Sequence, residues 1–235
     1  MNIYKGKIWD YCTQRYNGEY RRAVMQCLET DKDAKYIDLG CGDGNLTLKC
    51  GKRIGTHQVY GVDISEGRLD EADPQRMFLY KERADSELSF GDNYFDVVTA
   101  NQLIEHVDDT DKLIKEMYRI LKPGGYGVIS TNNLAASHWI IMFILGINPP
   151  TACESDEMCG LMYGEYHGER LHHRLFMLPG LLRVLQFYGF EIEKSVGTYW
   201  FPLPIWLARI ACRIDKVHAS CLVVKVRKPT EDKTC

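Results

Sequence analysis

A glycine-rich segment at residues 36–45 contains the residues of this chain that are best suited to chemistry. It reads Tyr-Ile-Asp-Leu-Gly-Cys-Gly-Asp-Gly-Asn, so an apolar run ends in Asp38 and three glycines follow at alternate positions. Glycine adopts backbone conformations with positive φ and has no Cβ to keep a ligand away from the main chain. An apolar strand, a glycine-rich turn and a following helix are typical of the ligand-binding corner of an open α/β sheet. The segment therefore predicts a small-molecule site.

The spacing of the glycines distinguishes between ligands. The dinucleotide fingerprint is G-x-G-x-x-G, and it rests a pyrophosphate on a helix N-terminus. Starting that pattern at Gly40 would put its third glycine at position 45, which is Asn45, and the chain instead has Gly42 and Gly44. An acid just before the loop suits a ligand with an ammonium group and no phosphate. A nicotinamide-dependent oxidoreductase is therefore the weaker alternative.

Polar residues follow two further predicted strands. Asp63 ends the second strand, where an acid accepts hydrogen bonds from both hydroxyls of a ribose in dinucleotide folds. Asn101 follows the fourth strand and precedes Glu105 and His106. Ligands of open α/β sheets bind outside the carboxyl ends of the strands, so we expect these residues at one edge.

These motifs together resemble the class I S-adenosylmethionine-dependent methyltransferases of the small-molecule type. Residues 38–44 match motif I of that family, residues 105–107 its Glu-His-Val segment, and residues 121–125 its Leu-Lys-Pro-Gly-Gly turn. The resemblance covers residues 18–229. It implies S-adenosyl-L-methionine as the cofactor and methyl transfer to an oxygen, nitrogen or carbon atom of a small-molecule acceptor.

The resemblance also implies roles for individual residues. Asp38 would lie near the methionine end of the cofactor, Asp63 at its ribose, and Asp85 at the exocyclic amine of its adenine. Ser89 stands where the family often has proline, so Asp85 also fits a solvated loop acid. The predicted cofactor-binding residues are Asp38, Gly40, Cys41, Gly42, Gly44, Asp63, Ile64, Asp85, Ser86 and Asn101.

Methyl transfer from a sulfonium needs no nucleophilic side chain, because the cofactor supplies the leaving group. A base is needed only if the accepting atom must lose a proton. His106 is the predicted catalytic base, since histidine titrates near neutral pH. A role in orienting the backbone at the start of the next helix fits His106 equally well.

Further residues are predicted to line the acceptor pocket, namely Tyr166, His172 and His173, with a solvated loop as the alternative. No metal site is predicted. A set of His172, His173, Glu169 and Cys159 matches no standard spacing of metal ligands.

Alternating strands and helices must position these residues. Strands are expected at 35–39, 58–63, 77–83, 95–100 and 126–130, and helices at 18–29, 44–52, from 65, at 109–122 and at 178–188. This alternation predicts a doubly wound, mostly parallel α/β sheet of Rossmann-like type, closed by antiparallel strands at 190–196 and 220–227 to give seven strands. We expect a single domain over residues 1–235, with residues 133–175 as an inserted lid.

Composition limits the class of protein and its partners. The 235 residues have a net charge of -3, and the absence of a basic segment argues against nucleic acid as a partner. Nine cysteines without a C-x-x-C pair argue against a disulfide framework and indicate a reducing, cytoplasmic location.

The apolar stretch at 139–147 is about half the length needed to span a bilayer, so no transmembrane segment is expected. Contact of this stretch and of residues 199–210 with a membrane surface is a further hypothesis. A non-catalytic S-adenosylmethionine-binding protein and a protein methyltransferase are the remaining alternatives, because methyl transfer has no diagnostic catalytic residue.

Overall fold

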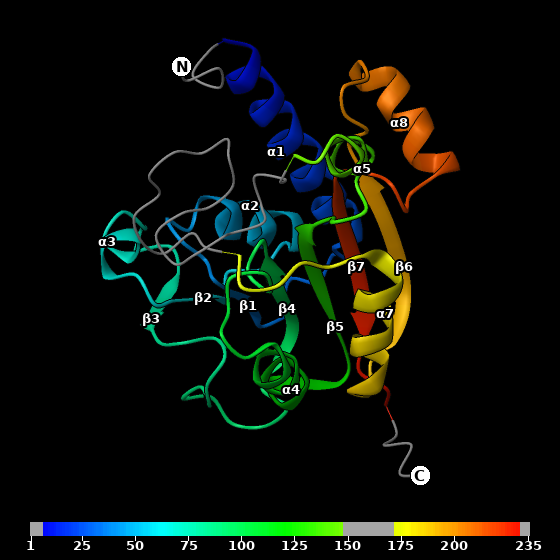
Figure 1. The fold of residues 1–235 in the computed structure, drawn as a ribbon. Coiled ribbons are helices and arrows are strands. Elements are labelled where there is room, and N and C mark those ends of the chain that lie inside the picture. The colour runs from blue at the N-terminus through cyan, green and yellow to red at the C-terminus, as the bar shows by residue number, and fades with distance from the viewer. Residues whose placement is uncertain (1–6, 148–171, 231–235) are drawn as a thin grey trace.

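The computed structural model describes residues 7–147 and 172–230, and a single mixed sheet organises this part of the chain (Figure 1). Its strands have the spatial order β3-β2-β1-β4-β5-β7-β6. They are β1 (Tyr36–Leu39), β2 (Val59–Asp63), β3 (Phe78–Lys81), β4 (Phe95–Asn101), β5 (Leu121–Asn132), β6 (Glu191–Thr198) and β7 (Cys221–Arg227).

The strand directions reverse at the end of the sheet that holds the last two strands. β1 pairs in parallel with β2 and β4, and β4 pairs in parallel with β5. β7 lies antiparallel between β5 and β6. These pairings confirm the predicted doubly wound, mostly parallel seven-stranded sheet. The switch in strand order falls between β1 and β4, so the carboxyl ends of these strands form the crevice where such folds bind ligands.

β5 is longer than the predicted strand at 126–130. It begins at Leu121, which pairs with Phe95, and the register shifts before Val97 pairs with Tyr126. Gly124 has φ +79° in the extra stretch, a conformation that glycine adopts without strain. The preceding helix ends at Ile120, before the Pro-Gly-Gly turn that is expected to stop it, and the turn lies within β5.

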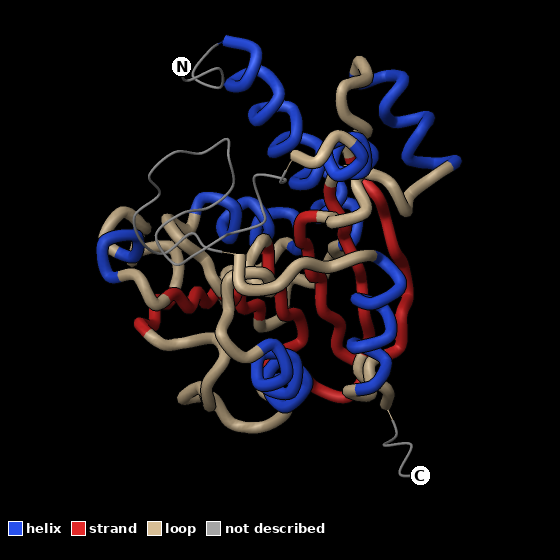
Figure 2. Tube along the Cα trace, viewed as in Figure 1, coloured by secondary structure: helices blue, strands red, loops and turns tan. Residues whose placement is uncertain are grey.

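Helices lie on both faces of the sheet, as Figure 2 shows. They are α1 (Lys7–Cys27), α2 (Asn45–Ile54), α3 (Glu66–Leu69), α4 (Thr110–Ile120), α5 (Ser137–Ile144), α7 (Leu178–Phe187) and α8 (Ile205–Ile214). Among the described helices, none is both long and apolar enough to cross a bilayer. α5 lies within the predicted lid, and residues 148–171 of that lid are outside the described part.

Alternation along each strand divides the core into two clusters. Tyr36 of β1 packs in one cluster with Val24 of α1 and Ile54 of α2. The next residue, Ile37, packs in the other cluster with Leu113 of α4 and Leu181 of α7. Because successive side chains of a strand point to opposite faces, α1 and α2 cover one face and α4 and α7 the other.

Candidate cofactor and acceptor site

A cavity of about 340 Å³ opens beside the carboxyl ends of β1 and β4. Its volume falls within the range of small-molecule sites in proteins. Five of the predicted cofactor residues line it, namely Asp38, Gly40, Cys41, Gly42 and Asn101. The structure therefore brings the glycine loop and the end of β4 to one site, although they are about sixty residues apart in the sequence.

The three glycines of the loop have different reasons to be glycine. Each has a positive φ, which favours glycine. A Cβ on Gly40 would lie 2.8 Å from Leu103 Cδ1, and a Cβ on Gly44 would lie 2.7 Å from Met77 Sδ. A Cβ on Gly42 would meet nothing closer than Arg68 Nη1 at 3.8 Å. Gly40 and Gly44 thus allow close packing of the loop, whereas Gly42 leaves its backbone open to the cavity.

Asp38 is a buried carboxylate at the base of the cavity, 2% exposed. Its Oδ2 accepts a hydrogen bond from Thr47 Oγ1 at 2.6 Å. Its Oδ1 accepts from Thr99 Oγ1 at 2.5 Å and from Asn101 Nδ2 at 3.2 Å. Burial raises the pKa of Asp38 to about 6 in spite of these donors, which favour the charged form. The carboxylate is thus held in place beside a cavity in which a positively charged ligand group would stabilise its charged form.

Asp38 is expected to make the stability of the protein depend on pH. Its pKa of about 6 in the folded state lies above the ordinary value of 3.8, so the folded state binds its proton more tightly than the unfolded state. Stability therefore falls as pH rises from about 4 to about 6 and stays low above that, by a total on the order of 3 kcal/mol. Asp38→Asn should remove this contribution when urea unfolding is measured from pH 4 to 7.

The exposed Asp33 provides the control for this measurement. Asp33→Asn should leave the pH dependence of the free energy of unfolding as it is in the wild type. Parallel pH profiles for the wild type and Asp38→Asn would show that the Asp38 carboxyl does not titrate abnormally.

Asp63 fixes the glycine loop to the end of β2. Its Oδ2 accepts a hydrogen bond from the Gly42 amide at 2.8 Å, and its Oδ1 accepts from the Ser65 amide at 2.9 Å. The side chain is 8% exposed, and the neighbouring Ile64 is 53% exposed. A carboxylate accepts about four hydrogen bonds, so Asp63 keeps capacity for a ribose. Its role and that of Ile64 in cofactor binding stay predictions.

Asp85 is occupied by contacts within the protein. Arg83 donates to it from Nε at 3.1 Å and from Nη2 at 2.9 Å. The amides of Asp108 and Asp109 both donate to its Oδ2. Burial alone would raise the pKa of Asp85, but the hydrogen bonds from Arg83 and the backbone keep it below its ordinary value. Asp85 thus ties two loops together, and its contact with adenine stays a prediction.

Neither Asp85 nor the neighbouring Ser86 is among the residues that line the cavity. The Oγ of Ser86 donates a hydrogen bond to the Arg83 carbonyl at 2.7 Å. Its predicted role at the cofactor therefore depends, like that of Asp85, on the position of this loop in the bound state.

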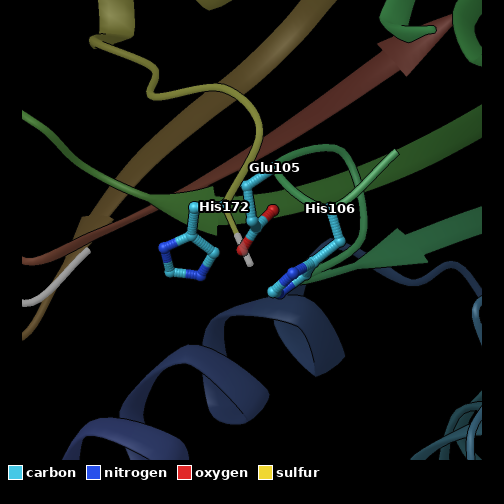
Figure 3. A group of neighbouring side chains, drawn as sticks. All are labelled: Glu105, His106 and His172. Carbon is cyan, nitrogen blue, oxygen red and sulfur yellow. The ribbon is translucent and has the colours of Figure 1, made fainter. Parts of the chain in front are cut away.

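A second cluster of polar side chains follows β4 (Figure 3). It contains Glu105, His106 and His172, and one ligand atom of each lies within 4.8 Å of those of the others. The two imidazole rings have centroids 4.7 Å apart. Glu105 is 1% exposed, and burial raises its pKa to about 7. The structure thus brings together two histidines that the sequence suggested separately.

His173 lies outside this cluster although its neighbour belongs to it. Its amide donates to the Glu105 carbonyl at 2.8 Å, and its exposed ring has Nε2 3.8 Å from Asp108 Oδ1. Tyr166, Glu169 and Cys159 lie outside the described residues. The predicted role of His173 at the acceptor receives no support from the direction of its contacts.

Sequence reasoning missed the part of the site that α1 contributes. Tyr16 donates through its hydroxyl to Gln102 Oε1 at 3.0 Å and also to Asn132 Oδ1. Gln102 has φ +51°, an uncommon conformation for a residue with a side chain. No motif marks Tyr16, because its contacts join α1 to the ends of β4 and β5, about a hundred residues away.

Sequence reasoning also missed several residues around the mouth of the cavity. They are Tyr20 and Arg21 on α1, Asp43 and Leu46 beside the loop, and Arg68 and Glu71 near α3. Their signal in the sequence is weak, since charged residues on helix surfaces are common. Two arginines and the buried Asp38 line the same cavity, so the cavity suits a ligand that carries both a negative and a positive group.

The fold and the cavity define an α/β protein with a small-molecule site at the switch point of its sheet. The comparisons with known proteins identify the class. A family model described as "Methyltransferase domain" matches residues 13–195 of the chain. The chain therefore belongs to the methyltransferase domain family. This membership confirms the resemblance to S-adenosylmethionine-dependent methyltransferases and the cofactor that it implied.

Curated relatives share part of the sequence. A demethylmenaquinone methyltransferase of Lactobacillus johnsonii is 35% identical over 122 residues, which are 48% of this chain and 50% of the relative. An enzyme of the same name from Staphylococcus aureus is 38% identical over 112 residues, which are 45% of this chain and 46% of the relative. The chain thus spans about half the length of the curated relatives it matches.

Solved structures share the fold over almost the whole chain. A SAM-dependent methyltransferase from Thermotoga maritima has a TM-score of 0.65 at 21% identity and covers 94% of this chain and 92% of its own. The [4+2]-cyclase SpnF has a TM-score of 0.62 at 19% identity and covers 90% of this chain and 81% of its own. The same fold therefore also occurs in a protein named as a cyclase.

Proposed function

We propose that this chain transfers the methyl group of S-adenosyl-L-methionine to an oxygen, nitrogen or carbon atom of a small-molecule acceptor. The observation that carries the proposal is the buried Asp38 beside a glycine loop whose Gly42 opens to a cavity. The cofactor has an ammonium group that suits a carboxylate, and no phosphate. Three acids, Asp38, Asp43 and Glu71, outnumber the two arginines of this cavity, and this balance disfavours the pyrophosphate of a nicotinamide cofactor.

The residues of the chain have distinct tasks in this proposal. Gly42 and Asp63 would hold the ribose end, whereas Asp38 and Asn101 would hold the methionine end. The cofactor, when bound, supplies a methyl group on a sulfonium that leaves readily. The protein orients the acceptor and excludes water. Orientation of this kind lowers the activation barrier by at most about 7–11 kcal/mol.

Arg21 is proposed to bind the carboxylate of the cofactor's methionine end. It lines the cavity from α1, where an arginine can form two parallel hydrogen bonds to a carboxylate. Arg21→Ala is expected to weaken S-adenosylhomocysteine binding about tenfold, because an interaction with a charged group contributes about 1.5–3 kcal/mol. Calorimetric titration of the wild type and the variant measures the difference.

Methylthioadenosine provides the control for Arg21, because it shares the adenosine but has no carboxylate. Its affinity should be nearly the same for the wild type and Arg21→Ala. An equal loss for both ligands would show that Arg21 acts on the shape of the site and does not contact the carboxylate.

The acceptor is proposed to be partly hydrophobic. The relatives named as demethylmenaquinone methyltransferases support an aromatic, quinone-type acceptor, although they match the chain over about half of their length. The test is formation of S-adenosylhomocysteine from S-adenosylmethionine, with and without demethylmenaquinone or a simple phenol. Acceptor-dependent formation supports the proposal. Binding of the cofactor without turnover of any acceptor would favour the non-catalytic alternative.

A membrane surface is proposed to be where the protein meets such an acceptor. Exposed apolar side chains gather at two helices, namely Ile141, Phe143 and Ile144 on α5, Leu145 at its C-cap, and Trp206, Ile210 and Ile214 on α8. The start of α5 contacts the segment after α8, since the Ser137 amide donates to the His218 carbonyl. Arg213 is exposed beside these apolar residues. An apolar helix face flanked by arginine is typical of interfacial helices.

Vesicle binding tests this contact. The double variant Trp206→Ser and Ile214→Ser is expected to lower co-sedimentation with anionic phospholipid vesicles at least about tenfold, because each large apolar side chain contributes about 1.5–3 kcal/mol on burial. Phe187→Ser is the matched control, because Phe187 is 79% exposed on α7. Equal binding of the double variant and the wild type would contradict the proposal.

A cytoplasmic location completes the proposal. In the described part of the chain, five cysteines are free thiols, namely Cys27, Cys41, Cys50, Cys212 and Cys221. Free, mostly buried thiols are typical of proteins in reducing compartments, which supports this location.

A further inference from the structure

Glu105 is a buried carboxylate, and neither of its oxygens has a hydrogen bond of good geometry from any residue the structure describes. Its side chain is 1% exposed. Burial raises its pKa, and the Thr131 hydroxyl and the Asn132 amide offset this effect only in part. A buried carboxyl group in this state is costly, and in proteins such groups are normally paired, hydrogen-bonded or bound to a metal ion. The proposed methyl transfer does not by itself explain this carboxylate.

Two imidazoles lie beside the Glu105 carboxylate. His106 is the next residue along the chain, and His172 comes from the segment that precedes α7. Figure 3 shows both rings close to the carboxylate, and the three ligand atoms lie within 4.8 Å of one another. Two histidines and one carboxylate form a donor set that zinc uses in catalytic sites. We propose that Glu105, His106 and His172 bind a divalent transition-metal ion of the zinc type.

The distances require only small side-chain movements for binding. Ligand atoms at about 2.1 Å from zinc in tetrahedral geometry are about 3.4 Å from one another. In the structure the three ligand atoms lie within 4.8 Å of one another, at most about 1.4 Å farther apart than in a zinc site with the ion bound. His106 and His172 are half-buried, and binding would require their rings to rotate towards the carboxylate. Three protein ligands leave a fourth position open.

This site differs from the set of possible metal ligands considered from the sequence, whose spacing matches no standard metal site. That set joined His172 to His173, but the structure directs His173 towards Asp108. Glu105 and His106 replace it, and they follow β4 only a few residues after Asn101, which lines the cofactor cavity. Asn132 Nδ2 lies 3.5 Å from His172 Nε2, which places the cluster beside the end of β5.

The cluster follows the strand end that lines the cofactor cavity, so the open position would be available to an acceptor atom. A metal ion there would lower the pKa of an acceptor hydroxyl, as zinc lowers that of bound water. This consequence, which favours a phenolic or enolic acceptor, rests on the proposed function. Metal binding itself does not, so it can be measured without turnover.

Cobalt(II) titration of tag-free, chelator-treated protein tests the site, because cobalt reports its coordination through visible absorption. The wild type is expected to bind one equivalent with the absorption of a low-coordinate nitrogen and oxygen site, and zinc should displace it. Glu105→Gln and His172→Asn should each weaken binding by at least about 100-fold, since loss of outer-shell partners alone costs about 10–100-fold. His173→Asn is the matched control and should bind like the wild type.

Two results would overturn the proposal. One is a wild-type protein that binds no cobalt. The other is binding that His172→Asn leaves unchanged, which would assign the metal to surface thiols or other histidines. His172→Asn decides the matter even if Glu105→Gln does not fold. Titration of the same samples with S-adenosylhomocysteine tests the proposed function independently.

Discussion

Asp63→Ala is expected to weaken the binding of S-adenosylhomocysteine at least about 100-fold. The variant loses the hydrogen bonds that Asp63 accepts from the amides of Gly42 and Ser65, so the glycine loop is no longer held against β2. It also loses the carboxylate that is proposed to accept hydrogen bonds from the ribose hydroxyls. Two hydrogen bonds to a charged group contribute about 3 kcal/mol or more, which corresponds to the expected factor. Calorimetric titration measures the affinity.

Asp70→Ala is the control for this variant, because Asp70 is an exposed acid at the end of α3, outside the residues that line the cavity. It should bind the ligand like the wild type, and circular dichroism should be the same for all three proteins. Wild-type affinity in a correctly folded Asp63→Ala protein would show that Asp63 takes no part in cofactor binding.

Asn133→Ala is expected to lower the free energy of unfolding by about 3 kcal/mol. Asn133 is fully buried directly after β5, and its Nδ2 donates to the carbonyls of Val217 and Ala219 at 2.7 and 2.6 Å. Its Oδ1 accepts from the Ala135 amide at 3.1 Å. Alanine leaves two carbonyls and an amide without these partners, and each unsatisfied group costs about 1–3 kcal/mol. The melting temperature should fall by about 10 °C.

The position of Asn133 makes this loss relevant to the acceptor site. Its hydrogen bonds hold the start of the α5 segment against the chain that leads into β7. Asn133→Asp should also destabilise the protein, because aspartate keeps the side-chain oxygen that accepts a hydrogen bond but loses the N–H groups that donate to Val217 and Ala219. Asn45→Ala is a control at an exposed asparagine and should change stability by at most about 0.5 kcal/mol. Similar melting temperatures for Asn133→Ala and Asn45→Ala would contradict this account.

The sequence predicted the sheet well because local patterns determine it. Short apolar runs such as residues 95–100 become strands buried on both faces, and the helix at 109–122 has apolar residues at helical spacing. Glycine spacing located the cavity, since Gly42 lines it in a conformation with positive φ. The predicted strand at 126–130 is shorter than β5, because β5 already begins at Leu121 and includes the Pro-Gly-Gly turn, where Gly124 has a positive φ.

The parts of the site that the sequence did not predict depend on contacts between distant segments. Tyr16 reaches Gln102 and Asn132 across the end of the sheet, and no pattern near Tyr16 indicates this. Asp85 matches a family position, but its pairing with Arg83 and with the backbone of residues 108–109 is visible only in three dimensions. Burial of Glu105 has the same origin, so the sequence pattern indicated His106 and not Glu105.

Calorimetric titration of the wild-type protein with S-adenosylhomocysteine, with NAD titrated alongside, tests the central claim most directly. The account predicts saturable micromolar binding of S-adenosylhomocysteine at one site per chain and no binding of NAD. Binding of NAD, or no binding of S-adenosylhomocysteine, would contradict the assignment of the glycine loop and the cavity at Asp38 to S-adenosylmethionine.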